Sequence, residues 1–200
     1  YMDSNKEKTL LNNLFSKGQL YLKKNNPKQA IINFKKILAF RPKNPQVLNL
    51  IGIAFHKISD FDKAVYYVTK AIKFETKEIG FHINLGNIFK DMKNFSASLK
   101  AYDDALKINK NSVDALYNMG VLFTEQKDHA HAVTYYEKVI QLNRNHKYSL
   151  DNLGNSYTEL SRFDEAIASY NKAISIDPNF NQAQFNLGLL LLLTNSLKLG

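Results

Sequence analysis

Hydrophobic residues recur with helical spacing along the chain. In residues 147–180, Leu150, Leu153, Tyr157 and Leu160 are 3, 4 and 3 positions apart, which draws one apolar stripe along a helix. After the polar stretch SRFD a second stripe follows, made of Phe163, Ala166, Ile167, Tyr170, Ala173 and Ile174. The pattern predicts two helices joined by a turn that is short enough to make them antiparallel.

The same pattern returns at a fixed step of 34 residues. Glycine marks the step at Gly18, Gly52, Gly86, Gly120, Gly154 and Gly188. A small residue stands twelve positions after the first five glycines, at Ala30, Ala64, Ser98, Ala132 and Ala166, and a large one four positions further on, at Phe34, Val68, Tyr102, Tyr136 and Tyr170. A regular period of this length indicates a repeat array, in which each unit packs mainly on its neighbours.

The small and large columns have a packing explanation. Glycine inside a helix costs about 1 kcal/mol relative to alanine, so its recurrence requires a compensating contact. We expect the backbone of the facing helix to approach each glycine, with small residues set against large ones so that the two helices interdigitate. These columns are therefore expected to form the core and to carry no chemistry.

The column pattern resembles the tetratricopeptide repeat (TPR) over about residues 11–193. The resemblance implies an all-α, right-handed superhelical solenoid of antiparallel helix pairs, with the first helices on the concave face and the second helices on the convex face. The expected organisation is a lead-in at 1–10, TPR units at 11–44, 45–78, 79–112, 113–146 and 147–180, and the first helix of an incomplete sixth unit at 181–200.

Composition narrows the class of partner. The net charge is +9, and residues 1–100 hold 18 Lys and Arg against 7 Asp and Glu, whereas residues 101–200 hold 9 against 11. Only three of these cations are arginine, the residue that nucleic-acid-binding surfaces favour, so the lysines are interpreted as a solvated convex face and nucleic acid is not the expected partner. The absence of cysteine, of a signal peptide and of a transmembrane segment favours a cytoplasmic location.

No catalytic arrangement is evident in the sequence. His129 and His131 are two positions apart and so point to different sides of a helix, and neither H-E-x-x-H nor G-x-S-x-G occurs. No phosphate-binding glycine loop is present, because most glycines are 34 residues apart. The sequence therefore predicts a protein that is not an enzyme and that needs no metal or cofactor.

Asparagine recurs two positions before the glycine of the last four units, at Asn84, Asn118, Asn152 and Asn186. Asparagine is a mediocre helix former, so either the composition of the chain is biased or these side chains bind something. An amide offers one acceptor and two donors, and first helices packed about 9–10 Å apart would meet an extended peptide at every third residue. A similar asparagine ladder occurs in TPR arrays of O-linked N-acetylglucosamine transferases and kinesin light chains.

Neighbouring groove positions are expected to select the side chains of a bound peptide. They include polar and apolar residues, namely Ile83, Asn87, Lys90, Tyr117 and Asn155. A carboxylate clamp of the kind found in chaperone-binding TPR domains would need Lys and Arg, where this chain has Phe15, Ile83, Asn118 and Asn152. The hypothesis is thus a non-catalytic scaffold that binds an extended peptide in its concave groove.

The last segment, FNLGLLLLL, makes a helix that is apolar nearly all round. The end of a repeat array should be polar on its outer face, so we expect the leucines to be covered. One explanation is self-association through Leu187, Leu190 and Leu191. The alternative is that these 200 residues are a fragment of a longer chain, in which the TPR array is the N-terminal partner-recruiting arm of an enzyme such as a bacterial glycosyltransferase.

Overall fold

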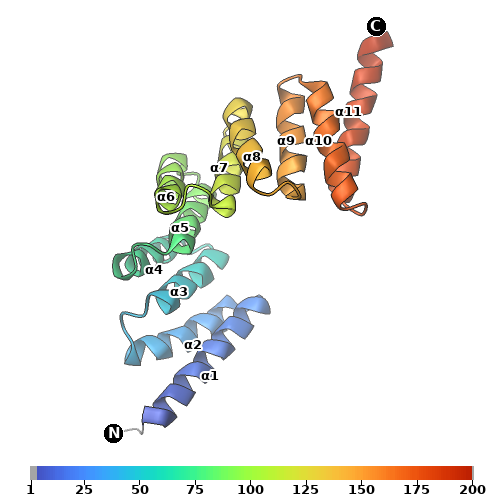
Figure 1. The fold of residues 1–200 in the computed structure, drawn as a ribbon. Helices are drawn as coiled ribbons and strands as arrows, with labels where there is room; N and C mark the ends of the chain where they lie inside the picture. The colour runs from blue at the N-terminus through green and yellow to red at the C-terminus, as the bar shows by residue number, and fades with distance from the viewer. Residues whose placement is uncertain (1–3, 200) are drawn as a thin grey trace. The chain divides into compact units, whose positions relative to one another are not determined.

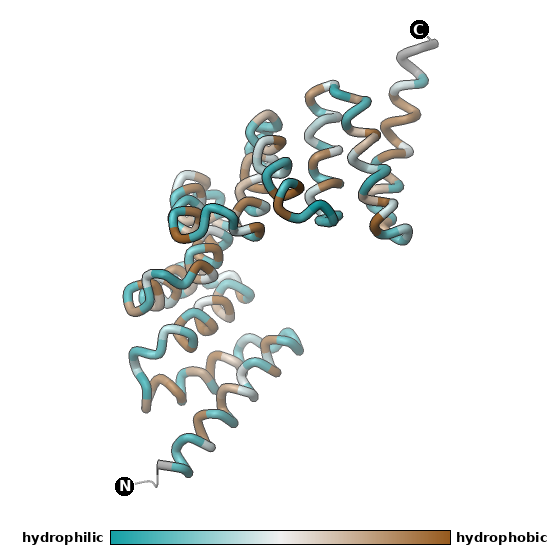
Figure 2. The backbone as a smooth tube through the Cα atoms, viewed as in Figure 1, coloured by the Kyte–Doolittle hydropathy of each residue, from teal (hydrophilic) through white to brown (hydrophobic). Residues whose placement is uncertain are grey.

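The computed structural model describes the backbone of residues 4–199 and the side chains of residues 5–195 (Figure 1). Eleven helices occupy this range: α1 (Ser4–Lys23), α2 (Pro27–Phe40), α3 (Pro45–Lys57), α4 (Phe61–Phe74), α5 (Ile79–Asp91), α6 (Phe95–Ile108), α7 (Val113–Glu125), α8 (His129–Leu142), α9 (Lys147–Glu159), α10 (Phe163–Ile176) and α11 (Asn181–Leu199). Figure 2 shows hydrophobic and hydrophilic segments alternating along the helices, as amphipathic helices require.

The helices form sequential antiparallel pairs in two compact units. Residues 1–108 make the first unit, which contains α1 to α6, and residues 109–200 make the second, which contains α7 to α11. Each odd-numbered helix from α1 to α9 packs most closely on the helix that follows it. The prediction of an all-α TPR solenoid of paired helices is confirmed. We refer below to the odd-numbered helices as first helices and to the even-numbered helices as second helices.

The recurring glycines accept an aromatic ring from the facing helix. A methyl group added at Gly154 would lie 2.5 Å from Cε1 of Tyr170, and one added at Gly86 would lie 2.3 Å from Cε1 of Tyr102. Both tyrosines are buried. The expected backbone approach is found at Gly52, where an added methyl group would lie 3.1 Å from the carbonyl oxygen of Ala64. At Gly18, Gly86, Gly120 and Gly154 the nearest atoms belong to an aromatic ring of the facing helix, and the space at Gly188 is open.

The small column lies at the centre of each helix pair. All four of its alanines have no exposed surface: Ala30, Ala64, Ala132 and Ala166. The third repeat has Ser98 instead, whose hydroxyl donates a 2.9 Å hydrogen bond to the carbonyl oxygen of Gly86. A polar group is therefore tolerated at this buried position because it has a partner.

One backbone geometry turns the chain from each first helix to its second helix. The turning residue has a positive φ between 53° and 60° in all five cases, at Asn25, Ser59, Lys93, Lys127 and Ser161. The following N–H bonds back to a carbonyl five residues earlier, as from Asn26 to Tyr21 at 2.8 Å, which defines a Schellman ending. The helices thus end at a common place although no glycine is present there.

Helix α11 has a covered side and an open side. Leu190 is buried in the core with α10, and Leu187 packs against the same core. The side chains of Phe185 and Leu192 are 63% and 68% exposed, and nothing lies within 4 Å of a methyl group added at Gly188. Of the leucines expected to mediate self-association, Leu190 therefore belongs to the interior of the unit, and Leu191 lies partly on the open side.

Candidate functional site

Three of the four recurring asparagines, Asn84, Asn152 and Asn186, bond to the preceding first helix. In the second unit, Nδ2 of Asn152 on α9 donates to the hydroxyl of Tyr117 on α7 at 3.3 Å. Nδ2 of Asn186 on α11 donates in the same way to Oδ1 of Asp151 on α9 at 2.9 Å. In the first unit, Asn84 on α5 donates to Oδ1 of Asn49 on α3 at 3.0 Å. Each of these bonds joins residues 35 positions apart, and we refer to them as cross-repeat bonds.

The cross-repeat bonds use only part of each amide. A primary amide has two N–H groups and an acceptor oxygen; Asn152 donates to Tyr117 and also lies near the hydroxyl of Tyr136, so its acceptor oxygen is what remains for another partner. Asn186 has less capacity left, because its Oδ1 accepts from Nε2 of Gln182 at 3.0 Å. The side chain of Asn118 makes no hydrogen bond within the described part of its unit, and all three asparagines are half-buried. Asn118, Asn152 and Asn186 are referred to below as the ladder.

Tyr117 stands beside the ladder with its ring packed sideways. Its ring centroid is 6.0 Å from that of Tyr136 and 5.2 Å from that of His146. Burial raises the pKa of Tyr117, so the phenol remains protonated at neutral pH. Its hydroxyl, which accepts from Asn152, therefore keeps a proton that it can donate.

Asp151 is a nearly buried carboxyl group on the same strip of α9. It is 5% exposed, and the bond from Asn186 is the hydrogen bond made by its side chain among the described residues. Burial raises the pKa of Asp151, and the hydrogen bond from Asn186 only partly opposes this effect. A carboxylate in this position favours further N–H donors.

Two other predicted groove residues also have structural partners. Oδ1 of Asn87 accepts from the hydroxyl of Tyr102 at 2.6 Å, and Oδ1 of Asn155 accepts from that of Tyr170 at 2.8 Å. Their acceptor oxygens therefore satisfy the phenols that lie over the recurring glycines.

In the first unit, Ile83 lies half-buried on α5 and Lys90 lies near the end of the same helix. Nζ of Lys90 donates to Oδ1 of Asp91 at 2.9 Å, and Nε2 of His56 lies 2.8 Å from Oδ2. Burial alone would raise the pKa of Asp91, but the bonds from Lys90 and His56 outweigh burial and lower it. The contact between His56 and Asp91 thus joins α3 to α5, and Lys90 bonds to the same carboxylate from within α5.

A recess of about 250 Å³ adjoins the last rung of the ladder. Asn186 and Glu159 supply polar groups at its wall, and Leu189, Leu190 and Leu193 supply apolar surface. This combination can accept an apolar side chain next to a hydrogen-bonded backbone.

The described residues contain neither a cluster of metal ligands nor a helix that could span a membrane. Between residues 4 and 199, no three His, Cys, Asp or Glu side chains are grouped as metal ligands. Over the same range, no helix has both the length and the apolar character that crossing a bilayer requires.

Comparisons with known proteins agree with this architecture. A family model described as "TPR repeat" matches residues 86–127 and 154–194, and models described as tetratricopeptide repeats match residues 113–146 and 11–44. The protein CTR9 homolog of Arabidopsis thaliana is 30% identical over 74 residues, which are 37% of this chain and only 7% of that protein.

Two solved structures have the same fold. The crystal structure of MamA superposes with a TM-score of 0.71 at 23% identity, covering 89% of this chain and 96% of that chain. YrrB, described as a TPR protein with an unusual peptide-binding site, gives a TM-score of 0.66 at 17% identity, with coverages of 86% and 89%. With the family models and the 34-residue helix pairs, these matches establish that the chain belongs to the tetratricopeptide repeat family, whose domains mediate protein–protein interactions.

Proposed function

We propose that this protein is a non-catalytic interaction scaffold that binds an extended segment of a partner protein along the ladder. The observation that carries the proposal is the pair of cross-repeat bonds of Asn152 and Asn186, 3.3 and 2.9 Å long. They tether successive amides to the preceding first helix in the same way. The two tethered asparagine side chains therefore recur at one repeat distance.

This repeat distance suits an extended peptide. Packed helices are about 8–10 Å apart, and a strand advances about 3.3 Å per residue, so every third peptide group would meet a rung. Each hydrogen bond contributes roughly 0.5–1.5 kcal/mol net. Because the tether already orients Asn152, little side-chain entropy remains to be lost when a peptide binds.

The family supports the same class of function. TPR domains mediate protein–protein interactions, and the structural relative YrrB is described as having a peptide-binding site. In this chain, the ladder would bind the peptide backbone, while Tyr117 and the recess beside Asn186 would select side chains.

Alanine at Asn118 and Asn152 together tests the ladder. Peptides selected by the wild-type chain from a displayed random library would be measured by fluorescence anisotropy. We expect the double variant to bind at least tenfold more weakly, because about 1.4 kcal/mol corresponds to tenfold and several bonds are lost. Asn171→Ala on the exposed face of α10 is the control, since it removes an amide side chain from a helix at a position outside the ladder.

Circular dichroism separates loss of binding from loss of structure. Asn118 makes no side-chain hydrogen bond in its unit, so Asn118→Ala should leave helix content and stability unchanged. Equal affinity of the double variant and the wild type, or failure to select any peptide, would refute the ladder.

We also propose that the open side of α11 pairs with a second copy of the chain. The exposed side chains there include Phe185, Leu189 and Leu192, and burying a leucine contributes roughly 1.5–3 kcal/mol. Leu192→Gln should lower the sedimentation-derived mass toward that of a monomer and leave helix content unchanged. A wild-type chain that is monomeric at high concentration would contradict this pairing.

A further inference from the structure

The first helix is longer than its counterparts. Helix α1 has 20 residues, whereas α3, α5, α7 and α9 each have 13. One repeat step before Pro45, where α3 begins, is Leu11, so the residues of α1 before Leu11 are an extension with no equivalent in the repeats that follow. Glu7 in this extension bonds to Nη2 of Arg41 at 2.9 Å, which ties the extension to the loop after α2.

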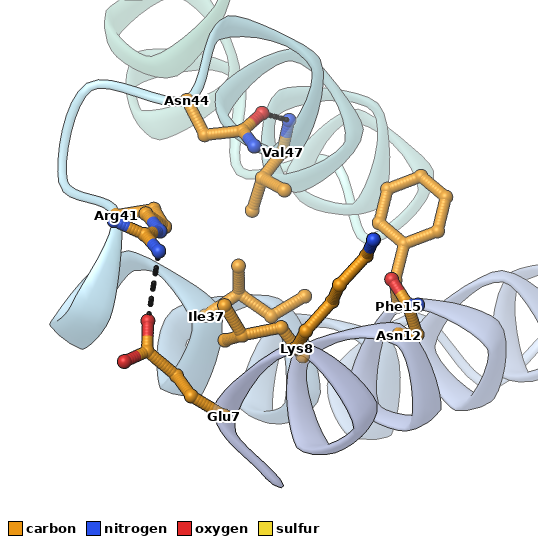
Figure 3. A pocket seen from close by; sticks show the side chains of 9 residues that line it. Glu7, Lys8, Asn12, Phe15, Ile37, Arg41, Asn44 and Val47 are labelled. Atoms are coloured by element: carbon orange, nitrogen blue, oxygen red, sulfur yellow. Dashed lines mark hydrogen bonds and ion pairs between the residues drawn. The ribbon is translucent and has the colours of Figure 1, made fainter. Parts of the chain in front are cut away.

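A recess of about 500 Å³ opens between this extension, the end of α2 and the start of α3 (Figure 3). Its apolar surface comes from Leu11, Phe15, Ile37 and Val47. Ile37 and Val47 are buried in the core, and Leu11 and Phe15 are half-buried. The volume falls within the roughly 300–1,000 Å³ of ordinary ligand pockets, so a large side chain with adjoining backbone fits.

The rim of the recess is rich in hydrogen-bond donors. Lys8 reaches over the recess from the side of Phe15, while Arg41 lies on the opposite side (Figure 3). Lys8 has no ion-pair partner among the described residues. Oδ1 of Asn44 accepts from the N–H of Val47 at 3.0 Å, which leaves the NH₂ group of Asn44 as a donor.

The charges around the opening favour an anionic partner. Its one carboxylate, Glu7, is already bonded to Arg41, so Lys8 supplies uncompensated positive charge beside an apolar surface. A carboxylate next to an aliphatic group complements both features.

The second repeat differs at the equivalent positions. Phe81 occupies the position of Val47 there and is buried, so a bulkier side chain stands where the first repeat has a valine. Nε2 of Gln46 also donates to Oε2 of Glu75 at 2.8 Å across the opening. In the first repeat, Asn12 stands at the position of Gln46 and Arg41 at the position of Glu75. Arg41 bonds to Glu7 and not to Asn12. The residues that line the recess therefore differ from those at the equivalent positions of the second repeat.

We propose that this recess binds a partner-protein segment in which a large aliphatic side chain is flanked by Asp or Glu. The aliphatic side chain lies on Ile37 and Val47, and a flanking carboxylate pairs with Lys8. The site lies in the first unit, whereas the ladder lies in the second, so this proposal does not rest on the proposed function.

Methyl NMR on the full chain tests the site with defined probes. The first probe is the capped peptide acetyl-Gly-Glu-Leu-Glu-Gly-amide, and the second has Gln in place of both Glu. We expect the first probe to shift the methyl signals of Leu11, Ile37 and Val47, and to bind three- to tenfold more tightly than the second at low salt. This preference should shrink at high salt, because the Debye length falls to about 3 Å at 1 M.

Two variants separate the charge from the apolar surface. Lys8→Gln should remove the preference for Glu, whereas Lys24→Gln, an equal loss of charge just beyond the end of α1, should preserve it. Val47→Phe copies the residue of the next repeat and should abolish the methyl shifts. Since Lys8 is exposed, its variant remains informative even if Val47→Phe fails to fold.

Three results would overturn the proposal. One is equal binding of the Glu and Gln peptides to the wild-type chain. Another is a preference for Glu that survives Lys8→Gln. The third is tighter binding of hexanoate than of the Glu peptide, which would make the recess a site for small carboxylic acids.

Discussion

Alanine at Gly154 and alanine at Gly188 are the same chemical change in two different surroundings. At Gly154, the new methyl carbon would lie 2.5, 2.7 and 2.8 Å from Cε1, Cδ1 and Cζ of Tyr170. That ring is 2% exposed, and its hydroxyl is bonded to Asn155 at 2.8 Å, so it has little freedom to move. At Gly188, no atom beyond the adjoining residues and the local backbone of α11 lies within 4 Å of the new methyl group.

Two energies decide the outcome, the gain in helix propensity and the cost of overpacking, and only the first acts at Gly188. Replacing a helical glycine by alanine stabilises the helix by about 0.8–1 kcal/mol, and this is the whole effect expected at Gly188. At Gly154 the same gain is set against overpacking, which costs about 1–3 kcal/mol. We therefore expect Gly188→Ala to stabilise the chain and Gly154→Ala to be neutral or destabilising, with about 1–3 kcal/mol between them.

Thermal and urea unfolding followed by circular dichroism measure this difference. One kcal/mol shifts the melting temperature of a domain of this size by roughly 2–4 °C. Gly120→Ala, which would meet Tyr136 at 2.5 Å, is a second crowded case and should behave like Gly154→Ala. If Gly154→Ala and Gly188→Ala stabilise the chain equally, the ring contact does not explain the glycine column.

Three further predictions concern the core and the turns. Asp151→Asn should stabilise the chain at pH 7, because burial raises the pKa of Asp151 and thus makes its ionised form costly in the native state. As the pH falls toward the ordinary aspartate range, the native wild type takes up a proton at Asp151. The urea midpoints of variant and wild type should then converge. Tyr102→Phe should cost about 0.5–1.5 kcal/mol in urea unfolding, because Asn87 loses a 2.6 Å donor. Lys127→Gly should raise the melting temperature through a gain of about 0.5–1 kcal/mol, because Lys127 has a φ of 60° that glycine adopts without strain; a lower melting temperature would contradict this.

Fold class follows from the sequence because the recurring columns have packing causes that act in every repeat. The turns were not predictable in the same way. Their left-handed residues, such as Asn25, Ser59 and Lys127, share no side-chain chemistry. The length of the connection determines this geometry, since a Schellman ending followed directly by the next helix needs one residue of positive φ at that place.

The candidate site was predictable only in part. The positions of Asn118 and Asn152 on first helices follow from the period, but the cross-repeat bonds do not. Each bond joins two different positions of the repeat. The donor is always an asparagine, whereas the acceptor is an amide in Asn49, a phenol in Tyr117 and a carboxylate in Asp151. A search for polar pairs 35 residues apart would have found them. The recess at Lys8 was not predictable from the period, because the helix extension that forms it lies outside the repeated pattern.

The open glycine on α11 makes the array a scaffold that can be lengthened by design. In four repeats, a second helix places an aromatic ring on the glycine of the helix before it, as Tyr170 does on Gly154. Gly188 presents the same surface without that ring. A copy of α10 fused after α11 through a suitable connection should therefore anneal onto it with Tyr in the vacant place, and modular proteins of chosen length could be assembled one helix at a time.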